Sequence, residues 1–487
     1  MSSQLSHPLS RRQMLRLLGL GSAGVALSAC APQVVTQTVE VPVEQTVVVK
    51  ETVVVEAGPG GPEYEEGELK ILLCCYTPEV LELQADYNKE FEETYPGVKV
   101  NQEQTPAGQS YFEKLQTLIA AGTPPDVFDM WEGYVGPYAE NGALKSLTPY
   151  VEVDPDIKMD DMQPAAIKAA SWQGNLYALI RDFYPGPSTL FYNKDLFDKA
   201  GVAYPSSDWT WDTMRAAAQG LTADTNGDSV TDQWGLTFET WFVPWLYWIW
   251  SNGGDVFNED ETKCTLTDPK SVEAIQYWAD LVNVDKSALS SAEVAAMQGA
   301  SNAFRTGTVG MYLGNTWDIQ DMLAAREQGL NWQACLSPKA NNDGRVYYMH
   351  LECWANSAQT QMPQTAWRYI RDYQFKAVSR FVKLYPGIPL LKQMLYLYMT
   401  PENAVYGWDR IPSIVSDPNN IRVPGAGAKW DKISGLIQAE LDLVFVGEKS
   451  ADDAAATACP QVDEELARTS ASMFDGEAGC RGCGPSS

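Results

Sequence analysis

Apolar residues between positions 68 and 130 fall alternately into short continuous runs and into helical stripes. The run 69–76 is apolar apart from one lysine, which is typical of a strand buried on both faces of a sheet. Thr77 and Pro78 then start a stretch with apolar residues at spacings of three and four, which predicts a helix with Thr77 as its N-cap. The pattern continues with a strand at 98–100, a helix over 111–121 and a strand over 125–130. This order of elements predicts an α/β domain with a largely parallel sheet.

The carboxyl ends of these strands provide the first candidate binding residues. In open α/β sheets, ligands bind beyond the carboxyl ends of the parallel strands. Those ends lie at Tyr76 and at the pair Trp131 and Glu132. We therefore expect Tyr76, Trp131 and Glu132 to line a ligand site.

A short apolar run at 17–29 follows Arg11 and Arg12 near the start of the chain. A membrane-spanning helix needs about 20 apolar residues, so this run is too short, and its basic start and small-residue end predict an export signal over 1–29. The segment SRRQMLR resembles a twin-arginine signal, and LSAC, which ends at Cys30, resembles a bacterial lipobox. The resemblance implies cleavage before Cys30, lipidation of its thiol and anchoring to the outer face of the cytoplasmic membrane. The alternative is an ordinary secretory signal with an unrelated cysteine.

Valine alternates with threonine, glutamate and glutamine over 34–56, and a Gly/Pro-rich stretch follows. No turn residues divide this stretch into a hairpin, so residues 30–67 are interpreted as an extended tether. A self-associating β segment is the alternative, because valine-rich runs also favour strand stacking. At the other end of the chain, residues 476–487 form a Cys/Gly-rich tail.

The composition of the chain limits the kinds of molecule that it can bind and the kinds of site that it can form. The chain has 487 residues and a formal net charge of −28, and such an acidic surface repels nucleic-acid phosphates. Only two histidines occur, so the sequence offers no histidine-based catalytic triad and no histidine-rich zinc site. Nine cysteines include Cys30, and the other eight allow 105 complete pairings. We expect no nucleic-acid partner, and the disulfide pattern stays open.

A series of motifs in chain order resembles one protein family. The motifs are AAGTPPDVFDMW (120–131), YAENGALKSLTPY (138–150), WQGNLYALIRD (172–182), LFYNKDLFDKAGV (190–202), FRTGTVGMYLGNTW (304–317) and PGIPLLK (386–392). Together they are similar to the extracellular solute-binding proteins, of the maltose-binding type, that deliver sugars to ABC importers. The resemblance covers roughly residues 68–450 of the chain.

The resemblance implies a periplasmic-binding-protein type II fold, with two α/β lobes of mixed sheets flanked by helices and a ligand cleft between them. The implied boundaries are 68–182 plus 350–384 for lobe one, 188–345 plus 388–475 for lobe two, and crossings near 182–187, 344–350 and 384–389. The implied function is an exported, monomeric receptor without enzymatic activity or cofactor. Its lobes close around a carbohydrate and present it to ABC permease subunits.

A carbohydrate requires aromatic rings against its apolar faces and fixed polar groups for its hydroxyls. The chain holds 16 tryptophans and 23 tyrosines, and four of the tryptophans lie within 241–250. At helical spacing Trp241, Trp245 and Trp248 share one face, while Trp250 points elsewhere. We expect Trp245 and Trp248 to face the cleft, with core packing as the alternative.

The resemblance adds further candidate residues. Trp317, which ends the 304–317 motif, matches a ligand-stacking tryptophan of the family. Asp182 lies in the first crossing, and Glu352 and Trp354 follow the second crossing. Glu352 is interpreted either as a ligand acceptor or as half of an ion pair.

The segment 224–232 resembles a calcium-binding loop. Oxygen ligands at relative positions 1, 3, 5, 7 and 9 are the side chains of Asp224, Asn226, Asp228 and Asp232 and, at position 7, the carbonyl of Val230. Relative positions 6 and 12 carry serine and glycine instead of the glycine and glutamate of the EF-hand loop. A plain turn rich in Asp and Asn is therefore the alternative to a structural calcium site.

Other function classes remain open from the residues alone. A glycan-active enzyme needs two carboxylates that flank the scissile bond, and 63 acidic residues always supply some such pair. The nucleophile-elbow and phosphate-loop patterns are both missing from the sequence. A surface lectin, or a receptor for a non-sugar solute such as a peptide or polyamine, is the other alternative.

Overall fold

This computed structural model describes residues 63–74, 76–105, 109–425 and 429–468. The chain divides into Met1–Gly60 and Gly61–Ser487, and the fold described below belongs to the second unit. The predicted signal, the lipidation residue Cys30, most of the predicted tether and the tail 476–487 lie outside the described residues. No helix in the described part is long and apolar enough to cross a membrane.

The larger sheet has seven strands in the order β12-β6-β11-β3-β1-β2, with β13 paired to β11. Its strands are β1 (Gly67–Cys74), β2 (Val98–Thr105), β3 (Val127–Met130), β6 (Ala178–Gly186), β11 (Tyr347–Asn356), β12 (Ile388–Pro389) and β13 (Ile421–Arg422). β1 runs parallel to β2 and β3, whereas β11 runs antiparallel to both β3 and β6. The sheet is mixed because β11 enters between β3 and β6 from the opposite end.

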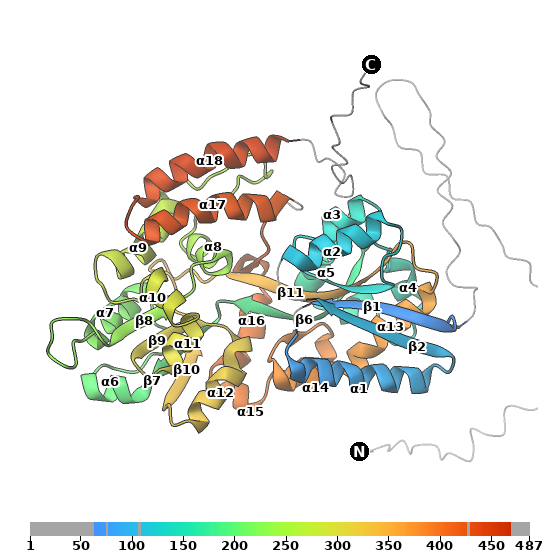
Figure 1. The fold of residues 1–487 in the computed structure, drawn as a ribbon, viewed down its shortest axis with the longest axis horizontal. Helices are drawn as coiled ribbons and strands as arrows, with labels where there is room; N and C mark the ends of the chain where they lie inside the picture. Colours follow the sequence, from blue (N-terminus) through green and yellow to red (C-terminus); the bar gives the residue numbers. More distant parts are fainter. Residues whose placement is uncertain (1–62, 75, 106–108, 426–428, 469–487) are drawn as a thin grey trace, which may run out of the picture. The chain divides into compact units, whose positions relative to one another are not determined.

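Helices cover both faces of this sheet, and Figure 1 shows α2, α3 and α5 on the side opposite to α1 and α14. They are α1 (Pro78–Thr94), α2 (Gln109–Ala120), α3 (Val135–Glu140), α4 (Thr148–Val153), α5 (Pro164–Ala169), α13 (Pro363–Lys376) and α14 (Val378–Leu384). Helix α1 buries the predicted stripe of Val80, Leu83, Tyr87 and Phe91. The Tyr87 hydroxyl donates to the Tyr369 carbonyl at 2.6 Å, which joins α1 to α13. The strand and helix order predicted for residues 69–130 is therefore confirmed.

The smaller sheet has four strands in the order β10-β7-β9-β8. They are β7 (Thr189–Asn193), β8 (Trp234–Phe238), β9 (Val309–Gly314) and β10 (Trp332–Leu336). Around it lie α6 (Lys194–Ala200), α7 (Trp211–Leu221), α8 (Phe242–Ser251), α9 (Pro269–Asn283), α10 (Ser291–Ala296), α11 (Ala300–Arg305) and α12 (Ile319–Glu327). The core between α8 and α9 is aromatic: the Trp248 and Trp278 rings stack with centroids 4.6 Å apart.

The remaining elements connect or cover the two sheets. They are the β4–β5 ribbon (Ser171–Trp172 and Asn175–Leu176), the helices α15 (Pro401–Val405), α16 (Ile411–Val415), α17 (Trp430–Phe445) and α18 (Ala451–Ala467), and the short 3-10 turns η2 (Met159–Asp161), η3 (Thr316–Asp318), η4 (Lys392–Leu397), η5 (Trp408–Arg410) and η6 (Pro418–Asn420). Helix α17 packs on α9, where the Asn283 amide donates to the Val444 carbonyl at 2.8 Å. Both long C-terminal helices therefore cover the half that contains the smaller sheet.

The chain passes between the two sheets several times. β6 ends at Gly186 and β7 begins at Thr189, while β10 ends at Leu336 and β11 begins at Tyr347. A third passage runs from β13 in the larger sheet to α17. The chain thus forms two lobes, one around each sheet. The exact lobe boundaries proposed from sequence stay a prediction; within the range 388–475 that they assign to lobe two, β12 and β13 pair with strands of the larger sheet.

Candidate functional site

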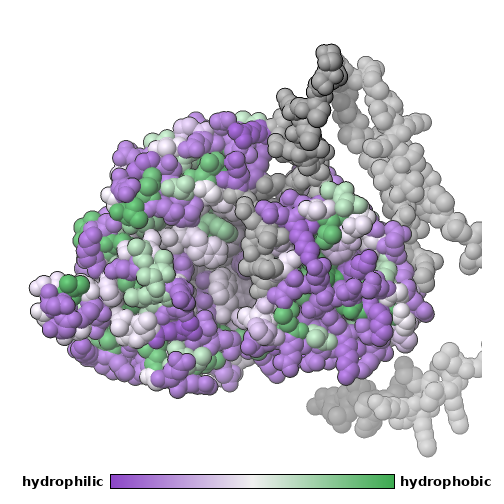
Figure 2. All heavy atoms as spheres, viewed as in Figure 1, coloured by the Kyte–Doolittle hydropathy of each residue, from purple (hydrophilic) through white to green (hydrophobic). Residues whose placement is uncertain are grey.

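A cavity of about 490 Å³ opens between the two lobes. One side consists of the start of α3 with the loop before it, helix α5 and Trp172. The other consists of the end of α8, the segment 255–261, β13 with the residues after it and the start of α17. Figure 2 shows a hollow in the surface between the half that contains α8 and the half that contains α2. Both lobes therefore contribute walls to the same space.

Aromatic rings form much of the cavity wall: Trp172, Trp250, Phe257 and Trp430. Trp430 is the first residue of α17, and its ring centroid lies 6.2 Å from that of Phe257. Trp172, in the β4–β5 ribbon, lies so close to Gly136 that a Cβ there would be 3.0 Å from its ring. Glycine at position 136 thus lets the Trp172 ring pack against the start of α3. Flat apolar rings on both sides suit a ligand with two apolar faces.

Polar groups of the cavity lie around Trp250. Its indole nitrogen donates to Asp255 at 2.9 Å, and Arg422 donates to the other oxygen of the same carboxylate at 2.9 Å. The Arg422 guanidinium also lies over the Trp250 ring, 5.9 Å from its centroid. Further polar lining comes from Lys168, Asn258, Glu259 and Glu261. Such groups can bind hydroxyls at the edges of a ligand held between the rings.

A second group of residues, the crossing network, lies where β11 returns to the larger sheet. The buried Glu132 carboxylate accepts from the Leu351 amide at 2.7 Å and from the Tyr348 hydroxyl, and it lies 3.0 Å from His350 Nδ1. Burial works against a charged imidazole, but the charge and hydrogen bond of Glu132 outweigh it, so the pKa of His350 lies above its usual value. Glu132 therefore ties the loop after β3 to β11.

The crossing network continues through the fully buried Arg181. Its guanidinium pairs with Glu352, lies 3.4 Å from Asp182, and donates to the Tyr76 hydroxyl at 2.9 Å. Burial raises the pKa of Asp182, and the charge of Arg181 opposes that shift. Tyr76 in turn donates to Asp129, whose pKa burial raises to about 6 against the charge of Arg181. The charged groups of this network are thus paired with one another.

Trp317 reaches the crossing network from the other lobe. It lies in the turn Thr316–Asp318, and its ring packs edge-on against Tyr184 at 5.6 Å and against His350 at 5.7 Å. The turn is held by Asp318, which accepts from the Asn315 amide at 2.7 Å and from the Tyr312 hydroxyl at 3.0 Å. Burial raises the pKa of Asp318 to about 7.

The structure brings several of the residues predicted from sequence together and disperses the others. Tyr76, Glu132, Asp182, Glu352 and Trp317 all belong to or touch the crossing network. From the sequence, Glu352 is interpreted either as a ligand acceptor or as half of an ion pair, and the structure shows it in an ion pair with Arg181. The buried Trp354 also joins the network, because its indole donates to Asp129 at 2.7 Å. Trp131 lies apart from these residues and packs edge-on against Phe112.

The tryptophans of α8 lie differently from the prediction. Trp245 and Trp248 are fully buried. Trp245 donates to Gln438 and its ring lies 6.0 Å from that of Trp430, while Trp248 stacks on Trp278 in the core. Trp250, which helical spacing set apart from them, lines the cavity. Helical spacing could not show which of these tryptophans lines the cavity, because every side chain from Val243 to Ser251 is buried. Trp430, Trp172 and Phe257 were missed because each stands alone in its stretch of sequence.

The predicted calcium loop forms a turn with its side-chain oxygens directed at its own backbone. Asp224 accepts from the amides of Asn226, Gly227 and Ser229, and Asp232 accepts from Thr225. These hydrogen bonds hold the pKa of Asp224 below its usual value. In the part of the chain that the structure describes, no group of three or more His, Cys, Asp or Glu residues is placed to hold a metal ion. The calcium site stays a prediction.

Comparison with known proteins gives consistent matches. The family model described as bacterial extracellular solute-binding protein matches residues 77–371. The maltotriose-binding protein of Pyrococcus abyssi is 22% identical over 383 residues, which cover 77% of each chain. An ABC substrate-binding protein of Listeria monocytogenes in complex with cycloalternan is 26% identical with a TM-score of 0.71, over 82% of this chain and 99% of that one. The GacH receptor of Streptomyces glaucescens, solved without ligand and with acarbose, is 21% identical with a TM-score of 0.69, over 82% and 99%.

Proposed function

Because the chain belongs to the bacterial extracellular solute-binding proteins, we propose that it captures a carbohydrate between its two lobes and delivers it to an ABC importer. The observation that carries this proposal is the cavity between the lobes, with tryptophan or phenylalanine on both sides. Its volume of about 490 Å³ lies within the range of small-molecule sites, about 300–1,000 Å³. The names of similar proteins, which mention maltotriose, cycloalternan and acarbose, support an oligosaccharide as the ligand class.

The mechanism follows from the position of the cavity. A ligand that touches the rings of both lobes gains contacts when the lobes approach, and this difference in contacts favours a closed form. The passages from β6 to β7 and from β10 to β11 are short enough to act as hinges between the sheets. The closed form presents both lobes at once to the permease subunits, and the receptor itself acts as a monomer.

A titration with mono- and oligosaccharides tests the ligand class. Binding is measured by calorimetry and by tryptophan fluorescence, with Trp172→Ala as the cavity variant. We expect the affinity to fall about tenfold, because the ligand loses one stacking ring. Trp209→Ala is the matched control, since Trp209 is also half-buried but packs against Phe197, within the other lobe. Saturable binding of a peptide or polyamine alone would overturn the carbohydrate reading, and turnover of a bound glycan would overturn the receptor reading.

The anchoring of the exported protein is a second part of the proposal. We propose that the thiol of Cys30 carries a lipid after cleavage of the signal, since LSAC ends at this residue. Mass spectrometry of the N-terminal peptide from membranes should show acyl chains on Cys30. Cys30→Ala should move the protein from the membrane fraction to the medium. A wild-type protein with an unmodified Cys30 contradicts the lipid anchor and leaves the carbohydrate site untouched.

A further inference from the structure

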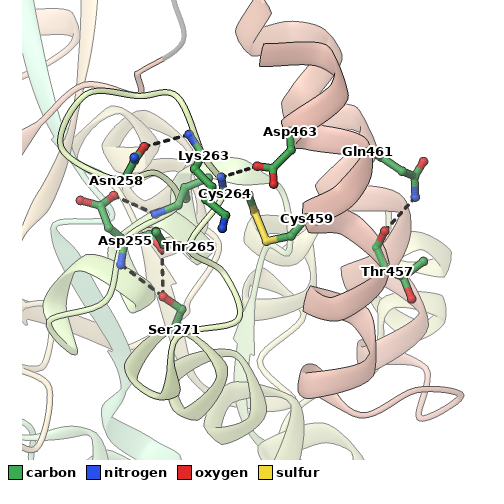
Figure 3. Close-up of a disulfide and its surroundings, with 11 residues drawn as sticks. Asp255, Asn258, Lys263, Cys264, Thr265, Ser271, Thr457, Cys459, Gln461 and Asp463 are labelled. Atoms are coloured by element: carbon green, nitrogen blue, oxygen red, sulfur yellow. Dashed lines mark hydrogen bonds between the residues drawn. A yellow bond between two sulfur atoms is a disulfide. The ribbon is translucent and has the colours of Figure 1, made fainter. Parts of the chain in front are cut away.

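None of the residues of helix α18 lines the cavity. Two of its side chains nevertheless hold the wall segment 255–265, here named the cavity hairpin. Cys459 forms a disulfide with Cys264, and the Asp463 carboxylate accepts from the Cys264 amide at 2.7 Å (Figure 3). The two cysteines are 195 residues apart in the sequence, so this attachment joins segments that no local turn brings together.

Within the cavity hairpin, Cys264 lies directly across from Phe257. These two residues form an antiparallel bridge, and the Thr265 amide donates to the Val256 carbonyl at 2.8 Å. At the tip, the Asn258 side chain accepts from the Lys263 amide at 2.8 Å, as Figure 3 shows. Residues opposite each other in antiparallel strands place their side chains on the same face, about 5 Å apart. Fixing Cys264 therefore fixes the Phe257 side of the cavity wall.

The C-terminal end of α18 holds the other part of the same wall. The Lys429 ammonium donates to the carbonyls of Leu466 and Arg468, at 2.7 Å each. A cation at this end also matches the negative end of the helix dipole. Lys429 is followed directly by Trp430, whose ring meets that of Phe257 edge-on with centroids 6.2 Å apart. One helix thus sets the positions of both rings.

We propose that the Cys264–Cys459 disulfide is a positioning element of the ligand site: through α18 it holds Phe257 against Trp430 and keeps this wall ordered before the ligand arrives. The proposal rests on the carbohydrate-binding function proposed above. A wall that is ordered in advance spares the ligand the entropy of ordering it, and that gain appears mainly as slower dissociation. Without the disulfide the cavity hairpin is held at its base by Ser271, which donates to the Asp255 carbonyl, and by Asp463.

The test replaces both cysteines in the mature, exported protein, as Cys264→Ser with Cys459→Ser. Reductant is avoided because Cys74 is also disulfide-bonded. We expect the dissociation constant for the bound oligosaccharide to rise about tenfold, mostly through a faster dissociation rate in stopped-flow fluorescence. Lys429→Met, which removes the second attachment, should weaken binding in the same direction.

A control separates positioning from general stability. Leu281→Ala removes a fully buried side chain of α9 and should lower the melting temperature without changing the affinity. If the double cysteine variant likewise loses only stability, the positioning role is refuted. Hydrogen exchange of residues 256–265 and 429–431 gives a readout that needs no ligand: exchange should quicken in the double variant, and unchanged exchange also refutes the proposal. Failure of the wild-type protein to bind any carbohydrate counts against the proposed function alone.

Discussion

Two regions between the lobes differ in how their polar groups are used. In the crossing network, the Glu132, Arg181 and Glu352 charges are paired with each other or with backbone and ring partners. In the cavity, aromatic rings form much of the wall, and the carboxylate of Asp255 serves to orient Trp250 and Arg422. A ligand entering the network would have to displace buried charge pairs, whereas a ligand entering the cavity displaces water from apolar rings. Proximity to the crossing is therefore a weaker indicator of ligand binding than an aromatic wall around a cavity.

The largest expected effect is a difference in the free energy of unfolding between a variant in the crossing network and a variant at the cavity rim. Glu132→Ala leaves the Leu351 amide and Tyr348 hydroxyl without their buried acceptor, and we expect it to lower the free energy of unfolding by about 3 kcal/mol. Glu259→Ala, at an exposed residue of the cavity rim, should change it by less than about 0.5 kcal/mol. Urea unfolding followed by circular dichroism measures both. Equal losses in the two variants would contradict the division of roles.

The pH dependence of stability at Asp318 sharpens the comparison. Glu352 pairs with the Arg181 cation, whereas the buried carboxylate of Asp318 accepts hydrogen bonds from uncharged groups. Asp318 accepts both of its hydrogen bonds through one oxygen and from uncharged groups, so Asp318→Asn can keep both. Because the folded pKa of about 7 lies above the usual value, wild-type stability is fully present near pH 4 and is lost as the pH rises through 7. The variant has no such loss. Its stability relative to wild type should rise by about 2 kcal/mol between about pH 5.5 and 8, in paired urea titrations. A flat difference would count against the charge explanation.

A matched pair of substitutions within α8 separates cavity from core. Trp250→Phe replaces the indole at the cavity wall with a smaller ring, and we expect ligand affinity to fall about fivefold, since the ligand loses part of its ring contact. Trp248→Phe, in the core stack with Trp278, should lower the free energy of unfolding by about 1 kcal/mol and leave affinity unchanged. Calorimetry and urea unfolding are run on both variants. The reverse outcome would place the ligand at Trp248, as the sequence pattern first indicated.

The smallest expected effect concerns His350. Its pKa is raised by Glu132, so the protonated ring stabilises the fold below the ordinary histidine pKa, and this stabilisation is lost as the pH rises through the higher folded value. His350→Gln should reduce the change in unfolding free energy over that pH range. This reduction should be smaller than the one that Asp318→Asn produces over its own pH range. An NMR titration of the imidazole provides the direct measurement, and a folded pKa at or below the ordinary value would exclude the mechanism.

The sequence predicted the parts of the fold that repeat a period. The strand 69–76 and the helix after Pro78 each present a clear pattern, and both form, with β1 ending two residues earlier than predicted. Glu132 could be found because it follows a predicted strand at the carboxyl edge of the sheet, and Trp317 because it ends a motif that resembles one of the family. The site could not be assembled in the same way, because Trp172, Trp250 and Trp430 come from three distant stretches and only tertiary packing selects them. Two-residue strands such as β12 and β13 also carry no period to detect.

The two sheets differ in how the chain contributes to them. All four strands of the smaller sheet come from one stretch, Thr189 to Leu336, whereas the larger sheet collects strands from Gly67 to Arg422. Its central strand β11 separates β6 from β3, so the sheet remains in two pieces until residues 347–356 have been synthesised. During synthesis from the N-terminus, the smaller sheet has all its strands first, and the larger one depends on contacts of long sequence separation, which form slowly. The sheet whose first strand comes earliest in the chain is therefore the last to receive all its strands during translation.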